Sequence, residues 1–385
     1  MTRGRRLSVR ALATCTLLLS ACDAKAPPEL RVGLIGVFDG AASSSSGMPA
    51  RLGAQLAVDE LNAVGGVLID GVLHRVRLID RETANRPDAA AAAARALVNL
   101  DSVDVLVGPQ FSALALAAGA VAEVSQIPLV APMASSPSVT ANRAFVTRLA
   151  FLDADQGDAL ARFAHDTLGL RRAGVLYNAA SDYGRGIIEL FGRTFTALGG
   201  RIVGTEQYNI DDPGDQQPQI MRLLAQQPDA IVLPNFSVRD SSQVRILRTA
   251  GFRGQLLGSD AWDAIALRGR EYVTGSIVVG NWDRSSTRPG VLSFLQRWKV
   301  RHAEVQPRAT AAATYDALRL IARAAEQAKV KSGLPLVRAL QNGGTFDGAF
   351  ARYQFNGTGN PIRGATLLEM RRDSLVFRVT LDPRR

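Results

Sequence analysis

The sequence is poor in the residues that most cofactor and cross-linking chemistry requires. Its 385 residues include two cysteines, Cys15 and Cys22, and three histidines, His74, His165 and His302. The histidines are far apart in the chain, and both cysteines lie in its first 22 residues. This composition offers no signature of a zinc centre, a disulfide framework or a Ser-His-Asp triad. The Gly-rich phosphate and dinucleotide motifs and the Gly-x-Ser-x-Gly elbow are also missing. We therefore expect no enzyme, no cofactor and no bound metal.

Positive charge is present but is not concentrated. The formal net charge is +10, and Arg3, Arg5, Arg6 and Arg10 all lie in the first ten residues. The remaining basic residues are scattered, with no run longer than two arginines. A nucleic-acid interface needs a focused basic patch. The sequence therefore predicts no nucleic-acid partner.

The first 28 residues have the features of an export signal followed by a tether. Basic residues precede a short apolar stretch that ends at Leu19-Ser-Ala-Cys22, too short to span a bilayer permanently. That tetrapeptide resembles the bacterial lipobox, which implies a signal peptide over 1–21 and lipidation of Cys22. Residues 22–28 would form the lipidated tether, so we expect a membrane-anchored lipoprotein in the periplasm or at the cell surface. The alternative is an ordinary signal peptide cleaved elsewhere, with Cys22 incidental.

From residue 30 onward, strand-like and helix-like segments alternate. The first unit is expected to consist of strands at 30–36, 74–80 and 103–107 and helices at 49–62 and 87–100. The rhythm restarts after about residue 150, with strands at 173–177, 201–208, 229–234 and 254–258 and helices at 183–198, 216–227 and 238–250. A strand at 275–280, helices at 289–302 and 314–328 and a hairpin at 346–360 with a Gly-Asn-rich turn follow. This order is typical of an α/β protein with doubly wound parallel sheets. Two such units predict a ligand cleft between lobes.

Two stretches carry the first candidate binding residues. Residues 103–112 and 127–136 each run as an apolar strand, stop at Gly or Pro, and then supply a hydroxyl, Ser112 or Ser135. Ligands of open α/β sheets bind at the carboxyl ends of the strands. The helix after Ser112 would direct free N–H groups and its positive dipole end at an anion, so we expect a carboxylate there. The alternative is that Ser112 is only a helix N-cap and Ser135 only a turn residue.

The order of these features resembles a known family. From about residue 30 to about residue 379, the chain is similar to type I periplasmic binding proteins, specifically the leucine/isoleucine/valine-binding proteins of branched-chain amino acid ABC importers. The matching segments are Val32-Gly-Leu-Ile-Gly36, 53–66, Val107-Gly-Pro-Gln-Phe-Ser112, 128–132, 148–153, Gln156-Gly157, Asp182-Tyr-Gly184, Thr314-Tyr-Asp-Ala317 and Phe346-Asp-Gly348. The resemblance implies two Rossmann-like doubly wound lobes joined by three crossovers. Lobe 1 would comprise 29–150 plus 282–345, and lobe 2 would comprise 151–281 plus 346–385.

The resemblance also implies roles for the residues of lobe 1. Ser112 matches the serine that holds the ligand's α-carboxylate. Met133 matches a position used through its backbone carbonyl, and Ser135 matches a hydroxyl residue that contacts both carboxylate and ammonium. Ala134, between them, completes this part of the candidate site. Ser46 lies at or near the place where the family's ligand loop carries an aromatic residue, so one side of the pocket is expected to be roomier or more polar.

The remaining candidate residues come from the second lobe and from its border with the first. Tyr183 matches a tyrosine that closes over the ligand, and Asp260 falls where the family has an acid that pairs with the α-ammonium. Phe236 lies near another aromatic position, and Tyr315 matches one that borders the pocket. Without the resemblance, Asp260 could be a helix N-cap and Tyr183 a packing residue.

The function implied by the resemblance is that of an extracytoplasmic solute-binding lipoprotein. It would bind an amino acid, with the branched-chain type favoured, by hinge closure and present it to an ABC permease in the inner membrane. The alternative is an envelope lipoprotein of the same fold that senses a ligand or binds a partner without being coupled to transport.

Overall fold

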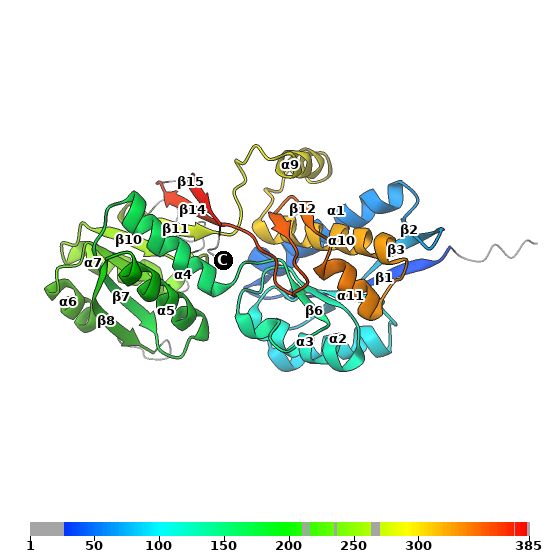
Figure 1. The fold of residues 1–385 in the computed structure, drawn as a ribbon, viewed down its shortest axis with the longest axis horizontal. Helices are drawn as coiled ribbons and strands as arrows, with labels where there is room; N and C mark the ends of the chain where they lie inside the picture. The colour runs from blue at the N-terminus through cyan, green and yellow to red at the C-terminus, as the bar shows by residue number, and fades with distance from the viewer. Residues whose placement is uncertain are drawn as a thin grey trace, which may run out of the picture.

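The computed structural model describes residues 27–209, 214, 216–234, 237–262, 270–372 and 374–382, with the backbone alone for 182 and 237–241. The molecule has two lobes that lie side by side along its longest axis (Figure 1), each built around one open sheet. The expected α/β class with two doubly wound lobes is confirmed.

Lobe 1 is built on a six-stranded sheet in the order β2-β3-β1-β4-β5-β6. The neighbours are parallel except for the β2–β3 pair. Its strands are β1 (Glu29–Gly36), β2 (Val67–Ile69), β3 (Val72–Glu82), β4 (Val105–Val107), β5 (Leu129–Ala131) and β6 (Val146–Arg148). Its helices are α1 (Met48–Ala63), α2 (Pro87–Asn99), α3 (Ser112–Ser125), α9 (Pro289–Arg301), α10 (Ala309–Ala328) and α11 (Gly333–Gln341), with a π-helical turn η1 (Ser43–Gly47) before α1. Helices α2 and α3 cover one face of the sheet, and α1 and α10 cover the other (Figure 1).

The small-residue face of α1 allows α10 to approach very closely. A Cβ added at Gly53 would lie only 2.1 Å from the carbonyl oxygen of Ala311. The helices therefore pack almost backbone to backbone, and only glycine fits at this crossing.

Lobe 2 is built on a seven-stranded sheet in the order β15-β14-β11-β10-β9-β7-β8, in which only the pairs made by β14 are antiparallel. Its strands are β7 (Arg172–Asn178), β8 (Arg201–Tyr208), β9 (Ala230–Leu233), β10 (Gln255–Gly258), β11 (Ile277–Gly280), β14 (Ala365–Met370) and β15 (Leu375–Leu381). Its helices include α4 (Asp153–Arg162), α5 (Asp182–Ala197), α6 (Gln217–Ala225) and α7 (Ser237–Thr249). Separate apolar clusters fill the two faces of this sheet.

One boundary of the expected lobes differs from the structure. The hairpin of β12 (Thr345–Asp347) and β13 (Arg352–Gln354) packs into the core of lobe 1 through Phe350 and Tyr353, so the third crossover lies after residue 355 and not after 345. The β12–β13 turn is at 348–351. The Gly-Asn-rich segment around 356–360 forms a second reversal, across which Gln354 and Ile362 pair antiparallel.

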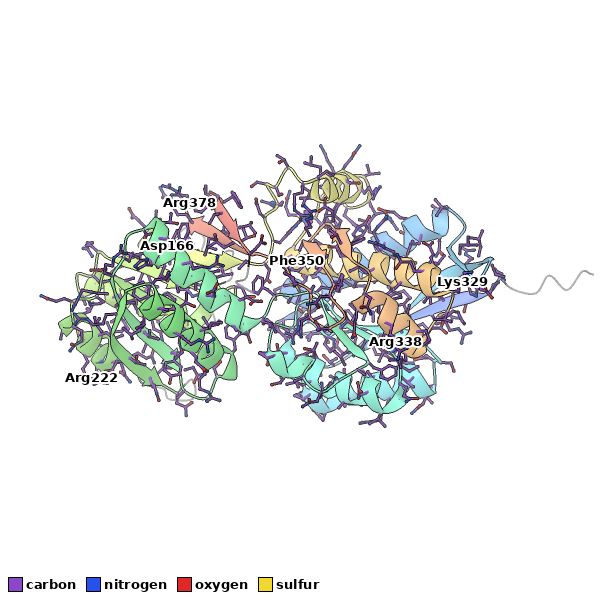
Figure 2. The ribbon with its side chains drawn as sticks, in the orientation of Figure 1. Asp166, Arg222, Lys329, Arg338, Phe350 and Arg378 are labelled. Atoms are coloured by element: carbon purple, nitrogen blue, oxygen red, sulfur yellow. The ribbon has the colours of Figure 1, made fainter. Side chains whose placement is uncertain are left out.

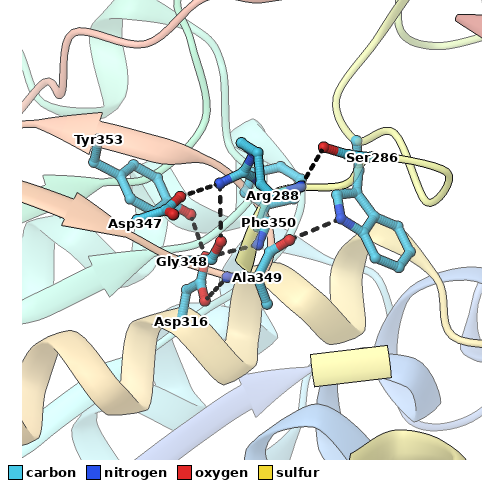
Figure 3. A network of polar contacts seen from close by, with 9 residues as sticks. Ser286, Arg288, Asp316, Asp347, Gly348, Ala349, Phe350 and Tyr353 are labelled. Carbon is cyan, nitrogen blue, oxygen red and sulfur yellow. Dashed lines mark hydrogen bonds and ion pairs between the residues drawn. The ribbon is translucent and has the colours of Figure 1, made fainter. Parts of the chain in front are cut away.

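The buried carboxylate of Asp316 on α10 explains where the hairpin turns. It accepts hydrogen bonds from the backbone N–H groups of Ala349 (2.7 Å) and Phe350 (2.8 Å) and from the Tyr353 hydroxyl (2.9 Å) (Figure 3). Burial raises the pKa of Asp316 to about 6. These contacts hold the turn against α10, a long-range interaction that turn propensity does not report.

A single buried side chain contacts all three crossovers. Arg363, in the third, donates hydrogen bonds to the carbonyl oxygens of Leu149 in the first (3.3 Å) and Asn281 in the second (2.7 Å). Its guanidinium also lies over the rings of Phe151 and Phe350. Figure 2 shows Phe350 near the middle of the molecule, where the lobes meet. The hinge is therefore tied together by one cation and two aromatic rings.

No helix in the described part of the chain combines the length and the apolar character needed to cross a bilayer.

Candidate functional site

The lobe 1 half of the site is built by two loops that follow adjacent strands. Ser112 follows β4 after a four-residue loop (108–111) and is the first residue of α3, and its hydroxyl accepts a hydrogen bond from the backbone N–H of Ser136 (3.2 Å). Ser136 belongs to the loop after β5, which pairs with β4. Phe111, not Ser112, is the N-cap residue, and no side chain caps this helix. The Ser112 hydroxyl thus joins the two loops at the helix N-terminus, and the N-cap alternative is not what the structure shows.

Arg148, which sequence reasoning did not single out as a site residue, holds the loop that carries Ser135. This fully buried residue ends β6 and donates to the carbonyl oxygens of Ala134 (3.2 Å) and Ser136 (2.7 Å) and to the Thr140 hydroxyl (2.9 Å). Burial lowers the pKa of Arg148 to about 10. The candidate residue Ala134 therefore uses its carbonyl oxygen to bind Arg148 within lobe 1. The only sequence signal was an arginine ending an apolar strand, inside a segment that resembles the family.

Asp153 connects the two halves of the site. It is the first residue of α4, and its backbone N–H donates to the carbonyl oxygen of Ser135 (3.2 Å). Burial raises the pKa of Asp153 to about 7, a hydrogen bond from the Ser135 hydroxyl opposes that rise, and the charge of Asp260 adds to it. This carboxyl is therefore poised to change its charge near neutral pH. In the sequence, Asp153 was named only as part of the segment after Arg148 that resembles the family, and not as a site residue.

The lobe 2 half of the site is centred on Asp260, just after β10. Its Oδ1 accepts a hydrogen bond from the Tyr183 hydroxyl (2.5 Å), and its Oδ2 accepts one from the Asn281 side-chain amide (2.5 Å). Its backbone N–H donates to Oε1 of Gln156 on α4 (3.0 Å). Burial, with the charges of Asp260 and Asp153, raises the pKa of Tyr183 well above its ordinary value, so the phenol stays neutral and donates. The structure therefore brings Tyr183 and Asp260 together, and adds Asn281 and Gln156.

The two halves present opposite polarity. Lobe 1 offers the Ser112 hydroxyl and the N-terminus of α3, with the Ser135 hydroxyl bonded to Asp153 in the neighbouring loop, and lobe 2 offers the Asp260 carboxylate. A ligand with a negative and a positive end would find a partner for each, which matters because an unpaired charge is costly to bury.

Three other candidate residues have contacts within lobe 1, and a fourth is not described. Met133 is partly buried against the lobe 1 core, and Ser46 is buried in η1. The ring of Tyr315 packs against Phe294 in the lobe 1 core, and its hydroxyl donates to Glu60 on α1 (2.8 Å). The contacts of Tyr315 are thus with α1 and α9, because it lies on the face of α10 that packs on those helices. Phe236 is outside the described residues, as is the lipidation candidate Cys22.

Two cavities of the described part of the chain lie away from Ser112 and Ser135. One of about 840 Å³ lies among the crossovers and is lined by Arg288, Tyr353 and Arg363, and another of about 610 Å³ lies at the β15 edge of lobe 2. Neither is lined by Ser112, Ser135 or Asp260. Over the residues that the structure describes, there is no cluster of three His, Cys, Asp or Glu side chains suited to a metal ion.

Comparison with known proteins adds three findings. A family model described as periplasmic binding protein matches residues 29–374. The Leu/Ile/Val-binding protein BraC3 of Rhizobium johnstonii is 27% identical over 255 residues, which are 65% of this chain and 67% of its own length. Two solved structures superimpose on nearly the whole fold. The leucine-binding protein LivK of Thermotoga maritima is 26% identical, with a TM-score of 0.81 and coverage of 92% of this chain and 99% of its own. LivJ of Streptococcus pneumoniae in complex with isoleucine is 24% identical, with a TM-score of 0.80 and coverage of 92% and 100%.

Proposed function

The chain belongs to the periplasmic binding protein family, and from this premise we propose that it is the solute-binding protein of an ABC importer, binding an amino acid in the cleft between its lobes. The family consists of solute-binding receptors that act outside the cytoplasm. The names of BraC3 and LivK make leucine, isoleucine and valine the first ligands to test. The observation that carries the proposal is the opposite polarity of the two halves of the site, with the Ser112 hydroxyl and a helix N-terminus on lobe 1 and the Asp260 carboxylate on lobe 2.

In this proposal the ligand binds lobe 1 first. Its α-carboxylate is held by Ser112, Ser135 and the free N–H groups at the start of α3. Closure about the three crossovers then brings Asp260 and Tyr183 onto the α-ammonium. The ligand stabilises the closed form because only there are both of its charges paired.

The test uses ligands that differ by one charged group. Residues 23–385 contain all of the described fold and no cysteine. This chain, stripped of ligand by unfolding and refolding, would be titrated calorimetrically with leucine, with 4-methylpentanoate (no ammonium) and with 3-methylbutylamine (no carboxylate). Asp260→Asn should weaken leucine about tenfold or more and leave 4-methylpentanoate unchanged. Ser112→Ala should weaken leucine and leave the amine unchanged.

The control is Asp283→Asn, a partly exposed residue at the second crossover whose carboxylate, among the described residues, accepts hydrogen bonds from Ser285 in its own turn. It should change none of the affinities. Equal leucine affinity for Asp260→Asn and the parent chain would remove Asp260 from the ammonium site.

We also propose that Cys22 carries a lipid anchor and that the partner is an ABC permease in the inner membrane. The support is the Leu19-Ser-Ala-Cys22 tetrapeptide after an apolar stretch. Cells expressing the full chain should incorporate labelled palmitate into it, and Cys22→Ser should abolish the label and release the protein from membranes. Labelling of the Cys22→Ser variant would contradict the assignment.

A further inference from the structure

We infer that Asn281 is a positioning residue that ties the orientation of the Asp260 carboxylate to the hinge. This inference rests on the proposed function, because it takes Asp260 as the group that pairs with the ligand's α-ammonium. It goes beyond that function by naming the side chain through which the ammonium end of the site and the crossovers act on each other.

Asn281 and Asp260 meet because they follow neighbouring parallel strands. Asp260 comes two residues after β10, and Asn281 comes directly after β11, where the second crossover begins. The side-chain amide of Asn281 donates to Oδ2 of Asp260 (2.5 Å), while the Tyr183 hydroxyl donates to Oδ1 (2.5 Å). A carboxylate with a donor on each of its oxygens is held in one orientation. One of these two donors belongs to the hinge.

The contacts of the Asn281 side chain indicate a role at Asp260 more than a role in stabilising the fold. Among the described residues, its amide nitrogen bonds Asp260, and its buried amide oxygen has no hydrogen-bond partner. Leaving a buried oxygen unpaired costs free energy and offsets much of what the bond of the nitrogen contributes. Positioning Asp260 is therefore the task that these contacts assign to the side chain.

The backbone of the same residue is bound within the hinge. The Asn281 carbonyl oxygen accepts a hydrogen bond from Arg363 in the third crossover (2.7 Å), and Arg363 also donates to the Leu149 carbonyl oxygen in the first (3.3 Å). Arg363 is only 4% exposed, and hydrogen bonds shielded from water are strong. Closure of two lobes changes the backbone dihedral angles of a few crossover residues. A rotation about the crossovers therefore moves Asn281, and its amide transmits the movement to Asp260.

The link acts in both directions. An ammonium group bound at Asp260 favours the crossover arrangement in which Asn281 holds the carboxylate, and that arrangement favours binding of the ammonium. A ligand without an ammonium group does not use the link. The quantity that reports the link is therefore the association constant for leucine divided by that for 4-methylpentanoate, which we call the ammonium preference.

Calorimetric titration of the ligand-stripped 23–385 chain measures this preference. Asn281→Leu removes the donor at nearly constant volume and should lower the preference about tenfold, because a hydrogen bond to a charged group is lost. Arg363→Met should lower it severalfold by releasing the Asn281 carbonyl. In the double variant the preference should be no lower than in Asn281→Leu alone, because both changes break the same link. In an Asp260→Asn background, Asn281→Leu should lower it no further.

The matched control is Asn342→Leu, the same change at an exposed asparagine whose amide donates to the Arg338 carbonyl oxygen on α11. It should leave the ammonium preference unchanged. Asn281→Ala, which introduces no larger apolar side chain, should behave as Asn281→Leu does. Both site variants should bind 4-methylpentanoate with the affinity of the parent chain, which also shows that they are folded.

Three results would overturn the inference and leave the proposed function standing. The first is a preference that neither Asn281 variant changes. The second is an equal loss of leucine and 4-methylpentanoate binding, which would indicate a structural role. The third is a double variant whose losses multiply, because Asn281 and Arg363 would then act separately. A parent chain that binds leucine no more tightly than 4-methylpentanoate would instead contradict the proposed role of Asp260, and the inference with it.

Discussion

Arg148 should be necessary for lobe 1 to hold its half of the site, and replacing it with methionine measures how much it contributes. The change removes the donor to the carbonyl oxygens of Ala134 and Ser136 and to the Thr140 hydroxyl. Each buried acceptor left without a donor costs about 1–3 kcal/mol. Relief from burying the guanidinium charge returns part of that cost. We expect a net loss of about 2–4 kcal/mol in the free energy of unfolding lobe 1.

The three tryptophans allow lobe 1 to be observed separately. Trp282 and Trp298 pack with the lobe 1 core, and Trp262 is buried in lobe 2. In a Trp262→Phe background, the tryptophan fluorescence that remains reports on lobe 1. Urea unfolding of Arg148→Met in this background should show a clearly lower midpoint. Binding of a carboxylate-bearing ligand should weaken about tenfold or more, because Ser135 and Ser136 lose their fixed positions.

The matched comparison is Arg143→Gln. Arg143 contacts the same loop through one long bond, 3.3 Å to the carbonyl oxygen of Val139. This variant should lose less than about 0.5 kcal/mol. If the two variants had equal midpoints and equal ligand affinities, the Arg148 guanidinium would not be what positions the loop, and the reasoning would be refuted.

Three further predictions concern the link between the lobes, the helix packing and the hinge. Because burial raises the pKa of Asp153 from 3.8 to about 7, the folded chain binds this proton more tightly than the unfolded chain, and stability should fall as pH rises from 4 to 7. Asp153→Asn should reduce that slope by up to about 1.4 kcal/mol per pH unit in urea unfolding, and an unchanged slope would show that the carboxyl is ionised throughout. Gly53→Ala should lower the melting temperature of the chain by several degrees, because the added Cβ would collide with Ala311. The control is Gly192→Ala, whose Cβ would lie 3.8 Å from its nearest neighbour and should leave the melting temperature unchanged. Equal melting temperatures for the two variants would show that α1 and α10 separate at little cost. Arg363→Met should broaden the distribution of distances between spin labels on the two lobes in the ligand-free chain, and an unchanged distribution would mean that Arg363 does not restrain the hinge.

Two elements of lobe 2 show which features could be predicted from the sequence and which could not. The strand at 201–208 was predicted with the bounds that β8 has, because a strand's hydrophobic pattern is contained in its own residues. The helix α4 was not predicted. Its residues Asp153–Arg162 are mostly polar or small, yet most of them are buried because the helix packs between α5 and the sheet.

The sequence by itself determined the alternation of strands and helices, and with it the position of Ser112 and Ser135 at the ends of neighbouring strands. These features depend on periodicity and turn residues within short segments, and each segment contains all the information they need. The tertiary structure alone decided which distant groups meet. Arg363 contacts the carbonyl of a residue 214 positions earlier, and the Tyr315 hydroxyl contacts Glu60, 255 positions away. Such pairings depend on which surfaces pack together once the lobes form, and a buried polar side chain then takes the partners that this packing places within reach.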